Sequence, residues 1–328
     1  MKKTSVVVLI CLASANTVFG MTADVESAIR NGAVGKYIYR VVDDKGVPVS
    51  NASAHVWFRS YGRPQDKANW VLKTDTNGVF SVEHRFNEKF SVGIDKEGYY
   101  HSHDEINYLS MMELPVKDGK WQPYGEIRTV VLKKIKNPHG MKIFDEQNHR
   151  RDIPVWGRWV GFDLERSDWM PPFGAGHFED VLLRFKADVR KHRVDFTYAM
   201  EVSFTNNPYA GAYAAKKDNS SDLKTEYVAN TNANFQSYFL FTTDSTADKP
   251  VHLGYVDQDD YLVFRTRTRI DDEGRLIGAH YGKICGIWRS TQKEMLMSDG
   301  CFNPVENDAN IEGDQQLLYA IRNYKNAK

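Results

Sequence analysis

Residues 70–82 read WVLKTDTNGVFSV, and this stretch decides the fold of the first part of the chain. Asn77-Gly78 is the strongest short-range signal for a two-residue hairpin turn, because both residue types tolerate the positive φ that such a turn needs. Strands rich in β-branched and aromatic residues flank it. The stretch therefore predicts two antiparallel strands, 70–74 and 79–82, joined by a tight turn.

The same period of two extends outward from this hairpin. Further strands are predicted at residues 36–42, 52–58, 90–94 and 127–132. Turn residues separate them, such as Asp43-Asp44-Lys45-Gly46, where Gly46 can take a left-handed conformation. Short strands with turns at regular intervals are typical of a β-sandwich, which we expect over residues 36–135.

Three segments in order carry a resemblance to a known family: Val41–Ala52, Thr74–Phe80 and Val92–Tyr99. They resemble the carboxypeptidase-regulatory-like family over about a third of the chain. The resemblance implies an immunoglobulin-like or prealbumin-like β-sandwich that serves as an accessory module. It does not imply peptidase activity, because the chain lacks the zinc-ligand pattern of carboxypeptidases. Residues 60–69 depart from the family pattern and predict a longer loop there.

A boundary is expected at Asn137-Pro138-His139-Gly140, since such residues favour turns and loops. Residues 140–328 continue with β-like patterns, including a long hairpin over 181–185 and 193–204 and a further strand at 235–242. They predict a second, mostly antiparallel β domain, so the fold class is all-β. The stretch 206–231 is polar and is expected to be an exposed insertion. Asp271-Asp272-Glu273-Gly274 predicts a hairpin turn, and residues 315–324 have a weak helical pattern.

The N-terminus has the layout of a secretory signal peptide over residues 1–20: two lysines, an apolar run and small residues. Cleavage fits best after Gly20, with Ala15 as the alternative. This predicts a secreted, periplasmic or cell-surface protein. Residues 21–35 form a lead-in segment with a short helix that ends near Gly32. No later stretch is apolar enough to span a membrane.

The charge and cysteine content bear on the class of ligand and on disulfide formation. Lys+Arg and Asp+Glu both number 43, so the sequence lacks the basic excess of a nucleic-acid-binding protein. Cys11 leaves with the signal peptide, and Cys285 and Cys301 remain. An even pair in an exported chain predicts one disulfide, and the alternative is two buried thiols.

Two stretches are candidate metal sites. His101 and His103 would point the same way on a strand and reach one cation. Asp257, Asp259 and Asp260 resemble the start of a calcium loop. The expectation is that the protein has no cofactor, with Ca²⁺ as the alternative. The alternatives are two exposed histidines after a turn and a polar hairpin tip.

Aromatic residues suggest a carbohydrate surface in the second domain, because flat rings stack on sugars. The candidate contacts are Trp159, Trp169 and Phe173, and the alternative is that the loop 169–173 plugs the end of a sheet. Carboxylates lie nearby in the sequence, as the pair in a glycosidase would. They are Asp163, Glu165, Asp168, Glu179 and Asp180.

The sequence lacks Gly-x-Ser-x-Gly, His-Glu-x-x-His and phosphate-binding glycine motifs. The leading expectation is an exported, non-catalytic binding or structural protein whose ligand is a carbohydrate or another cell-surface component. The alternatives are a polysaccharide- or peptide-acting hydrolase with its site in the second domain, and a self-assembling surface protein.

Overall fold

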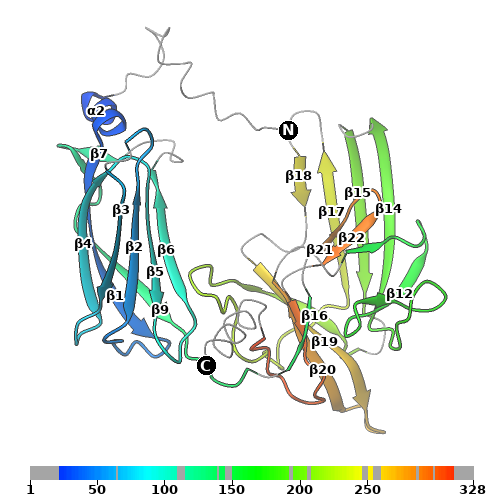
Figure 1. Ribbon diagram of the computed structural model, residues 1–328. Coiled ribbons are helices and arrows are strands. Elements are labelled where there is room, and N and C mark those ends of the chain that lie inside the picture. The colour runs from blue at the N-terminus through cyan, green and yellow to red at the C-terminus, as the bar shows by residue number, and fades with distance from the viewer. Residues whose placement is uncertain are drawn as a thin grey trace. The chain divides into compact units, whose positions relative to one another are not determined.

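A computed structural model describes most of the chain. The chain divides into two compact units (Figure 1). Unit 1 is Met1–Leu132 and unit 2 is Lys133–Lys328. The described residues are 22–63, 66–108, 115–138, 140–144, 150–191, 195–204, 208–245, 250–253, 260–285, 288–297 and 300–313. The predicted signal peptide and the weak helical pattern at 315–324 lie outside them. Within these ranges no helix has the length and apolar character of a membrane span.

Unit 1 begins with helix α2 (Ala23–Asn31), the lead-in helix that the sequence predicts. The hydroxyl of Thr22 accepts a hydrogen bond from the Val25 amide and caps the N-terminus. Gly32 ends the helix with φ of 73°. The first strand then starts at Ala33, earlier than expected, and includes Gly35, over which the rings of Phe86 and Tyr37 pack too closely for a side chain.

Two sheets make up the rest of unit 1, as a β-sandwich requires (Figure 1). The first sheet contains β1 (Ala33–Asp43), β4 (Val79–Phe86), β7 (Val116–Lys117), β8 (Lys120–Trp121) and β9 (Glu126–Leu132). The second runs in the order β3-β2-β5-β6, with β2 (Ser53–Arg59), β3 (Ala68–Lys73), β5 (Lys89–Asp95) and β6 (Ser102–Asn107). Strand β1 pairs antiparallel with β4 and parallel with β9.

Alternating residues of the two sheets meet in an aromatic core. Tyr37 of the first sheet stacks on Phe90 of the second with ring centres 4.4 Å apart, and within the first sheet Tyr39 stacks on Phe80 at 5.0 Å. All four side chains are buried. The core confirms the predicted alternation, because residues two apart on a strand share a face.

A turn forms at Asn77-Gly78, but the predicted hairpin is wrong: β3 pairs with β2 in the second sheet and β4 pairs with β1 in the first, so the turn carries the chain from one sheet to the other. Asp75 accepts hydrogen bonds from the amides of Asn77 and Val79, both at 2.8 Å. Gly78 has φ of 73°, and a Cβ there would collide with the carbonyl oxygen of Val41. Two constraints therefore require glycine at this position.

Unit 2 contains three sheets among its described residues, which confirms the all-β fold class. The six-stranded sheet has the order β13 (Asp168–Trp169), β12 (Trp159–Asp163), β14 (Val181–Lys191), β15 (Asp195–Ser203), β17 (Tyr238–Ser245), β18 (Pro250–Leu253). The five-stranded sheet has the order β10 (Lys142–Phe144), β23 (Gly300–Phe302), β20 (Leu276–Ile284), β19 (Asp260–Ile270), β16 (Gly211–Lys216). The third has the order β11 (Arg150–Asp152), β22 (Glu294–Met297), β21 (Trp288–Ser290).

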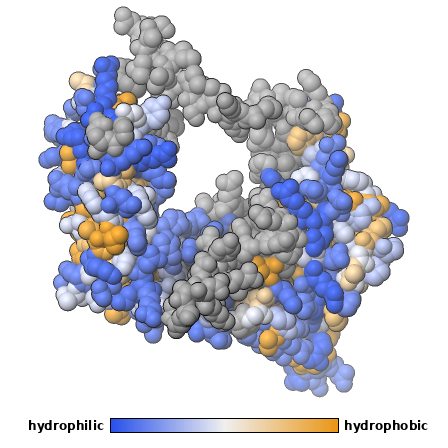
Figure 2. Space-filling view, viewed as in Figure 1, coloured by the Kyte–Doolittle hydropathy of each residue, from blue (hydrophilic) through white to orange (hydrophobic). Residues whose placement is uncertain are grey.

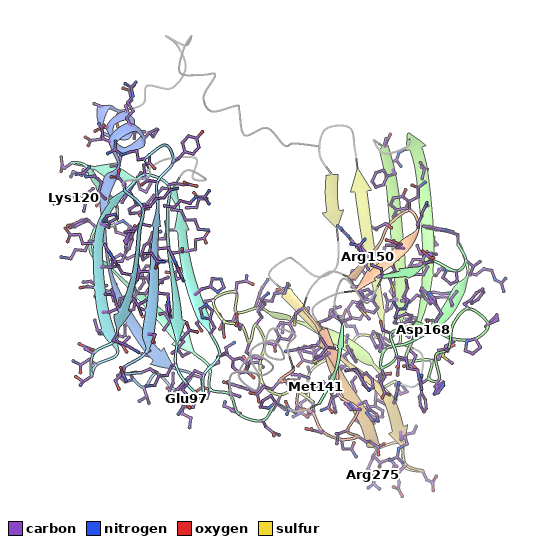
Figure 3. All side chains as sticks on the ribbon, in the orientation of Figure 1. Glu97, Lys120, Met141, Arg150, Asp168 and Arg275 are labelled. Atoms are coloured by element: carbon purple, nitrogen blue, oxygen red, sulfur yellow. The ribbon has the colours of Figure 1, made fainter. Side chains whose placement is uncertain are left out.

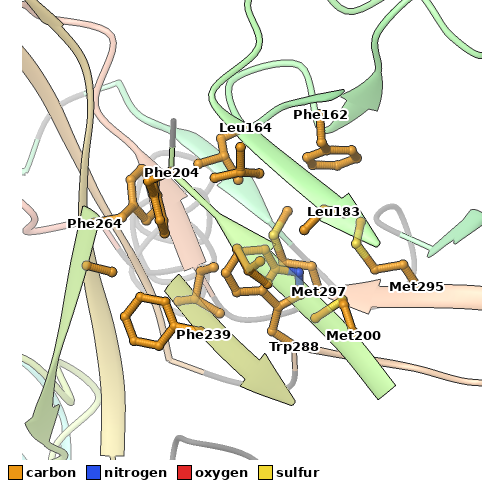
Figure 4. Packing of buried hydrophobic residues seen from close by; sticks show 14 of the residues in the cluster. Phe162, Leu164, Leu183, Met200, Phe204, Phe239, Phe264, Trp288, Met295 and Met297 are labelled. Atoms are coloured by element: carbon orange, nitrogen blue, oxygen red, sulfur yellow. The ribbon is translucent and has the colours of Figure 1, made fainter. Parts of the chain in front are cut away.

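One large apolar cluster joins these three sheets (Figure 4). The six-stranded sheet contributes residues such as Phe162, Leu183 and Met200. Phe264 enters from the five-stranded sheet, and Trp288 from the three-stranded sheet. Because β12, β14, β15 and β17 bury alternate residues here, the side chains between them point to the opposite face.

The stretch 206–231 is not an exposed insertion. It contains β16, which pairs antiparallel with β19 from Gly211↔Arg265 to Lys216↔Asp260. Ala212 and Leu223 are buried. The sequence of β16, GAYAAK, is small and weakly apolar, so only its pairing with β19 reveals it as a strand.

The predicted disulfide is not formed: Cys285 and Cys301, both within the described residues, are buried and not joined. Cys301 lies opposite Lys283 in the β20–β23 pair, and Cys285 is two residues further along. Such diagonal neighbours are about 7–8 Å apart, whereas a disulfide needs Cα atoms about 4.4–6.8 Å apart. The alternative of two buried thiols is the one that the structure supports.

Candidate functional site

The outer face of the six-stranded sheet, opposite the core, carries a row of aromatic and charged side chains. Strand register places one row of side chains across β12, β14, β15 and β17. That row is Trp159, Arg184, Glu201 and Leu240. Tyr238 and Lys186 lie one step to either side of the row on the same face. These six residues are called the platform below.

Polar contacts connect the platform into one network. The Arg184 guanidinium carbon lies 4.5 Å from the centre of the Trp159 ring, a cation–π contact that orients the indole. The Nε of Arg184 donates to one oxygen of Glu201. The other oxygen accepts from the Tyr238 hydroxyl at 2.9 Å and from Lys186 Nζ at 3.2 Å.

Glu201 is the charged centre of this network, and its side chain is only 9% exposed. The hydrogen bond from Arg184, with further bonds from Tyr238 and Lys186, lowers the pKa of the Glu201 carboxyl to about 2. Desolvation and the hydrogen bond to Glu201 raise the pKa of the Tyr238 hydroxyl. Glu201 therefore stays ionised near neutral pH and acts as an anchor for its three donors rather than as a general acid.

Large apolar groups on the platform are exposed. Trp159 is 38% exposed, Tyr238 48% and Leu240 45%. Figure 2 shows that the surface in view is mostly hydrophilic, with hydrophobic residues in small groups. Exposed aromatic side chains that are held in place by charged neighbours are typical of binding surfaces.

Beyond Trp159 on the same face lies Gly161, and the side chain of Glu179 packs over it. A Cβ at this glycine would lie 2.6 Å from Glu179 Oε2 and 2.7 Å from Met170 Cγ. Glycine therefore lets the segment after β13 fold down onto the sheet. The exposed carboxylate of Glu179 borders the platform on this side.

One arginine and three carboxylates hold the segment 163–180 in place; we call Asp163, Glu165, Asp180 and Arg267 the carboxylate clamp. Arg267 makes ion pairs with all three acids, and its side chain is 12% exposed. It lies in β19 with φ of 50°, where the pairing with β20 shifts register. The clamp thus ties the five-stranded sheet to the end of the platform's sheet.

The two aspartates of the clamp are fully buried and also bind backbone amides. Asp163 accepts from the amides of His177 and Phe178, and Asp180 accepts from that of Leu164. Burial raises the pKa of the Asp180 carboxyl, although Arg267 and Thr266 donate to it. These carboxylates hold the two ends of the segment 164–180 together, which is a structural role.

Of the three aromatic residues predicted to contact a ligand, only Trp159 belongs to the platform. Trp169 is 4% exposed, lies edge-on to Phe162 and Phe185, and donates from Nε1 to the Asp152 carbonyl at 3.0 Å. It is a core residue and not a surface contact, because segment 164–180 folds back onto the sheet. Phe173 is exposed on this segment.

Asp168, also suggested for glycoside hydrolysis, binds backbone amides within the segment 164–180 (Figure 3). Its carboxylate accepts from the amides of Trp169 at 2.8 Å and Ala175 at 3.1 Å. With Asp163, Glu165 and Asp180 in the clamp, four of the five carboxylates suggested for hydrolysis hold the fold of this region. Glu179 is the one that is exposed on the platform's border.

Neither predicted metal site is assembled within the described residues, where no group of three or more His, Cys, Asp or Glu is placed to hold a metal ion. His101 Nδ1 lies 2.8 Å from Asp95 Oδ1, and its ring stacks beside His103 with centres 6.4 Å apart. Asp260 pairs with Lys216 at 2.6 Å. Asp257 and Asp259 lie outside the described residues.

Sequence reasoning missed Arg184, Lys186, Glu201 and Tyr238. Each falls in or next to a predicted strand, so alternation alone assigns each to an outward face. What the sequence lacks is the register between strands. Register is what brings Arg184 next to Trp159 and opposite Glu201.

No protein-family model matches the chain, and no curated protein matches it in sequence. Among solved structures, it is similar to 3-chlorocatechol 1,2-dioxygenase from Rhodococcus opacus 1CP, with 15% identity over 32% of this chain and 61% of that one, at a TM-score of 0.26. A chlorocatechol 1,2-dioxygenase from Pseudomonas putida matches with 12% identity over 31% of this chain and 61% of that one, at a TM-score of 0.25. The chain thus spans less than two thirds of the structures it matches, and the scores identify no activity for it.

Proposed function

We propose that the protein is an exported, non-catalytic carbohydrate-binding protein and that the platform is its binding surface. The observation that carries the proposal is the exposed Trp159 ring, held by Arg184 in a row that continues through Glu201 to Leu240. An exposed aromatic ring stacks on the apolar face of a sugar, and neighbouring N–H groups bond its hydroxyls. A ring that is already oriented loses little conformational entropy on binding.

The arrangement supports binding more than hydrolysis. A glycosidase needs two carboxyl groups on either side of the scissile bond, one of them able to donate a proton. Glu201 has a pKa lowered to about 2 and its oxygens accept from three side chains. Its chemistry suits the orientation of Arg184 and Tyr238.

For unit 1 we propose an accessory role, as its resemblance to carboxypeptidase-regulatory-like domains implies. The turn geometry at Gly46 and Gly78 and the aromatic core between the two sheets are compatible with that role. Export rests on the signal-peptide pattern of residues 1–20.

A glycan array followed by calorimetric titration tests the proposal with wild type, Trp159→Ala and Trp156→Ala. Trp156 is the matched control, because it is similarly exposed but packs against Phe185 and Tyr198 from the other face of the sheet. We expect Trp159→Ala to weaken binding at least tenfold, since aromatic anchors contribute about 2 kcal/mol or more, and Trp156→Ala to bind like wild type. Absence of any glycan binding by wild type, or equal binding by both variants, would contradict the proposal.

A further inference from the structure

The hydrogen-bonding groups that the platform leaves unused are almost all donors. Both oxygens of Glu201 already accept hydrogen bonds from Arg184, Lys186 and Tyr238. Arg184 uses only Nε in this contact, and within the described residues its Nη1 and Nη2 make no hydrogen bond. Lys186 Nζ uses one of its three hydrogens, and its side chain is 54% exposed.

The charges closest to Trp159 on this face are also unbalanced. Arg184 and Lys186 are two cations over the single carboxylate of Glu201. Further along β14 beyond Lys186, Arg190 pairs with both Asp188 at 2.6 Å and Asp195 at 2.8 Å, so that group carries one net negative charge. Glu179, on the Gly161 side, is the nearby carboxylate that would repel an anion. The cations nearest to the Trp159 ring are therefore Arg184 and Lys186, and the carboxylates of Glu179 and of the Arg190 group lie further away on either side.

We infer that the ligand of the platform is an acidic glycan, whose carboxylate or sulfate oxygens bind Arg184 and Lys186 while a sugar ring stacks on Trp159. The inference rests on the proposed function and adds the chemical class of its ligand. Anionic oxygens match what the platform offers, because charge-assisted bonds from guanidinium and ammonium groups are the strong ones. Arg184 is suited to this, since a guanidinium that stacks on an aromatic ring keeps its edge for bonding.

The distance between Trp159 and Lys186 suits a single sugar ring that carries an acidic group. Trp159 lies opposite Arg184, and Lys186 is the diagonal neighbour two residues along β14. Diagonal neighbours in an antiparallel pair are about 7–8 Å apart. A pyranose ring on the indole would thus place an acidic substituent over the Lys186 side and away from Glu179.

The test measures binding of the full mature chain to paired glycans that differ in acidic groups: galactan, polygalacturonate and sulfated galactan, together with a glucan, polyglucuronate and hyaluronan. We expect binding to acidic members only, with affinity falling about tenfold between low and high salt because screening weakens charge contacts. Preference for polyuronates over sulfated galactan would identify a carboxylate as the acidic group, and the reverse preference would identify a sulfate.

Lys186→Gln is the informative variant, because it removes a charge and leaves the Arg184–Glu201 pair intact. We expect it to weaken binding of the acidic glycan about tenfold. Lys216→Gln, which removes an exposed lysine from β16 on the other sheet, should have no effect. Binding of neutral glycans that depends on Trp159 but not on Lys186 or salt would overturn this inference and leave the proposed function standing. Binding of no glycan of either kind would overturn both.

Discussion

Arg267 and Asp180 lie 87 positions apart in the sequence, and the guanidinium of Arg267 donates to both oxygens of the Asp180 carboxylate, at 3.0 and 3.1 Å. The contact joins β19 of one sheet to the start of β14 in another. Because Asp163 and Asp180 are buried, Arg267 is what compensates their charge. The segment that borders the platform is therefore held by buried ion pairs in addition to apolar packing.

Replacing Arg267 should strongly destabilise unit 2. Arg267→Met leaves the buried Asp163 and Asp180 carboxylates without their cation, which typically costs about 3–5 kcal/mol. Arg269→Gln is the control two residues along the same strand, where only an exposed pair with Glu306 is lost and the unfolding free energy should change far less. Urea unfolding followed by tryptophan fluorescence measures both. Equal losses would mean that the clamp is not a structural centre.

Crowding and backbone strain can be separated at two glycines of unit 1. Both Gly78 and Gly46 have positive φ, but a Cβ at Gly78 would collide with Val41, whereas a Cβ at Gly46 would meet nothing within 4 Å. Gly46→Ala should cost about 1–2 kcal/mol of unfolding free energy from the left-handed backbone alone.

Gly78→Ala adds the collision and should cost at least about 1 kcal/mol more, as overpacking does. Thermal unfolding of both variants beside wild type gives the comparison. If the two variants unfold together, the close approach of Val41 to the turn is not part of the folded state.

The two cysteines should behave as buried thiols. In the native protein, Cys285 and Cys301 are both buried and should react slowly with a thiol reagent. After unfolding in denaturant without reductant, both should react rapidly, and the intact mass should show no loss of two hydrogens. An unfolded protein in which neither thiol reacts would contain the disulfide that the structure lacks.

Acid should selectively remove the contribution of Glu201 to stability. Its pKa falls from an ordinary value of 4.5 to about 2 in the folded protein, so folding favours the ionised form. The contribution is fully present above about pH 4.5 and is lost as the pH falls toward 2.

The difference in unfolding free energy between wild type and Glu201→Gln should therefore be constant from pH 7 to 5 and should shrink below that. Urea titrations at a series of pH values measure it. A difference that persists unchanged at pH 3 would mean that the Arg184, Lys186 and Tyr238 contacts do not depend on the ionised carboxyl.

Local signals predicted the elements whose conformation is decided by neighbours in the sequence. The turns at Asn77-Gly78 and at Asp271–Gly274, and the end of α2 at Gly32, follow from residues that tolerate positive φ. Alternation likewise predicted the hairpin of β14 and β15, which the structure confirms.

Elements that depend on distant partners were missed. Strand β16 is recognisable only through its pairing with β19. Trp169 is buried because Asp163 and Asp180 bind Arg267, which is 104 and 87 positions away, and fold the segment 164–180 inward. The platform needs the register of four strands, so Trp159 was predicted and its partners were not.

The most direct test of the platform is an NMR titration of the indole N–H signals with an acidic oligosaccharide. The chain contains seven tryptophans, and Trp→Phe variants assign their signals one by one. We expect the Trp159 signal to shift on saturation, while the signals of Trp169 in the core and Trp156 on the opposite face keep their positions. A saturating ligand that shifts Trp57 or Trp70 of unit 1 and leaves Trp159 unchanged would contradict it.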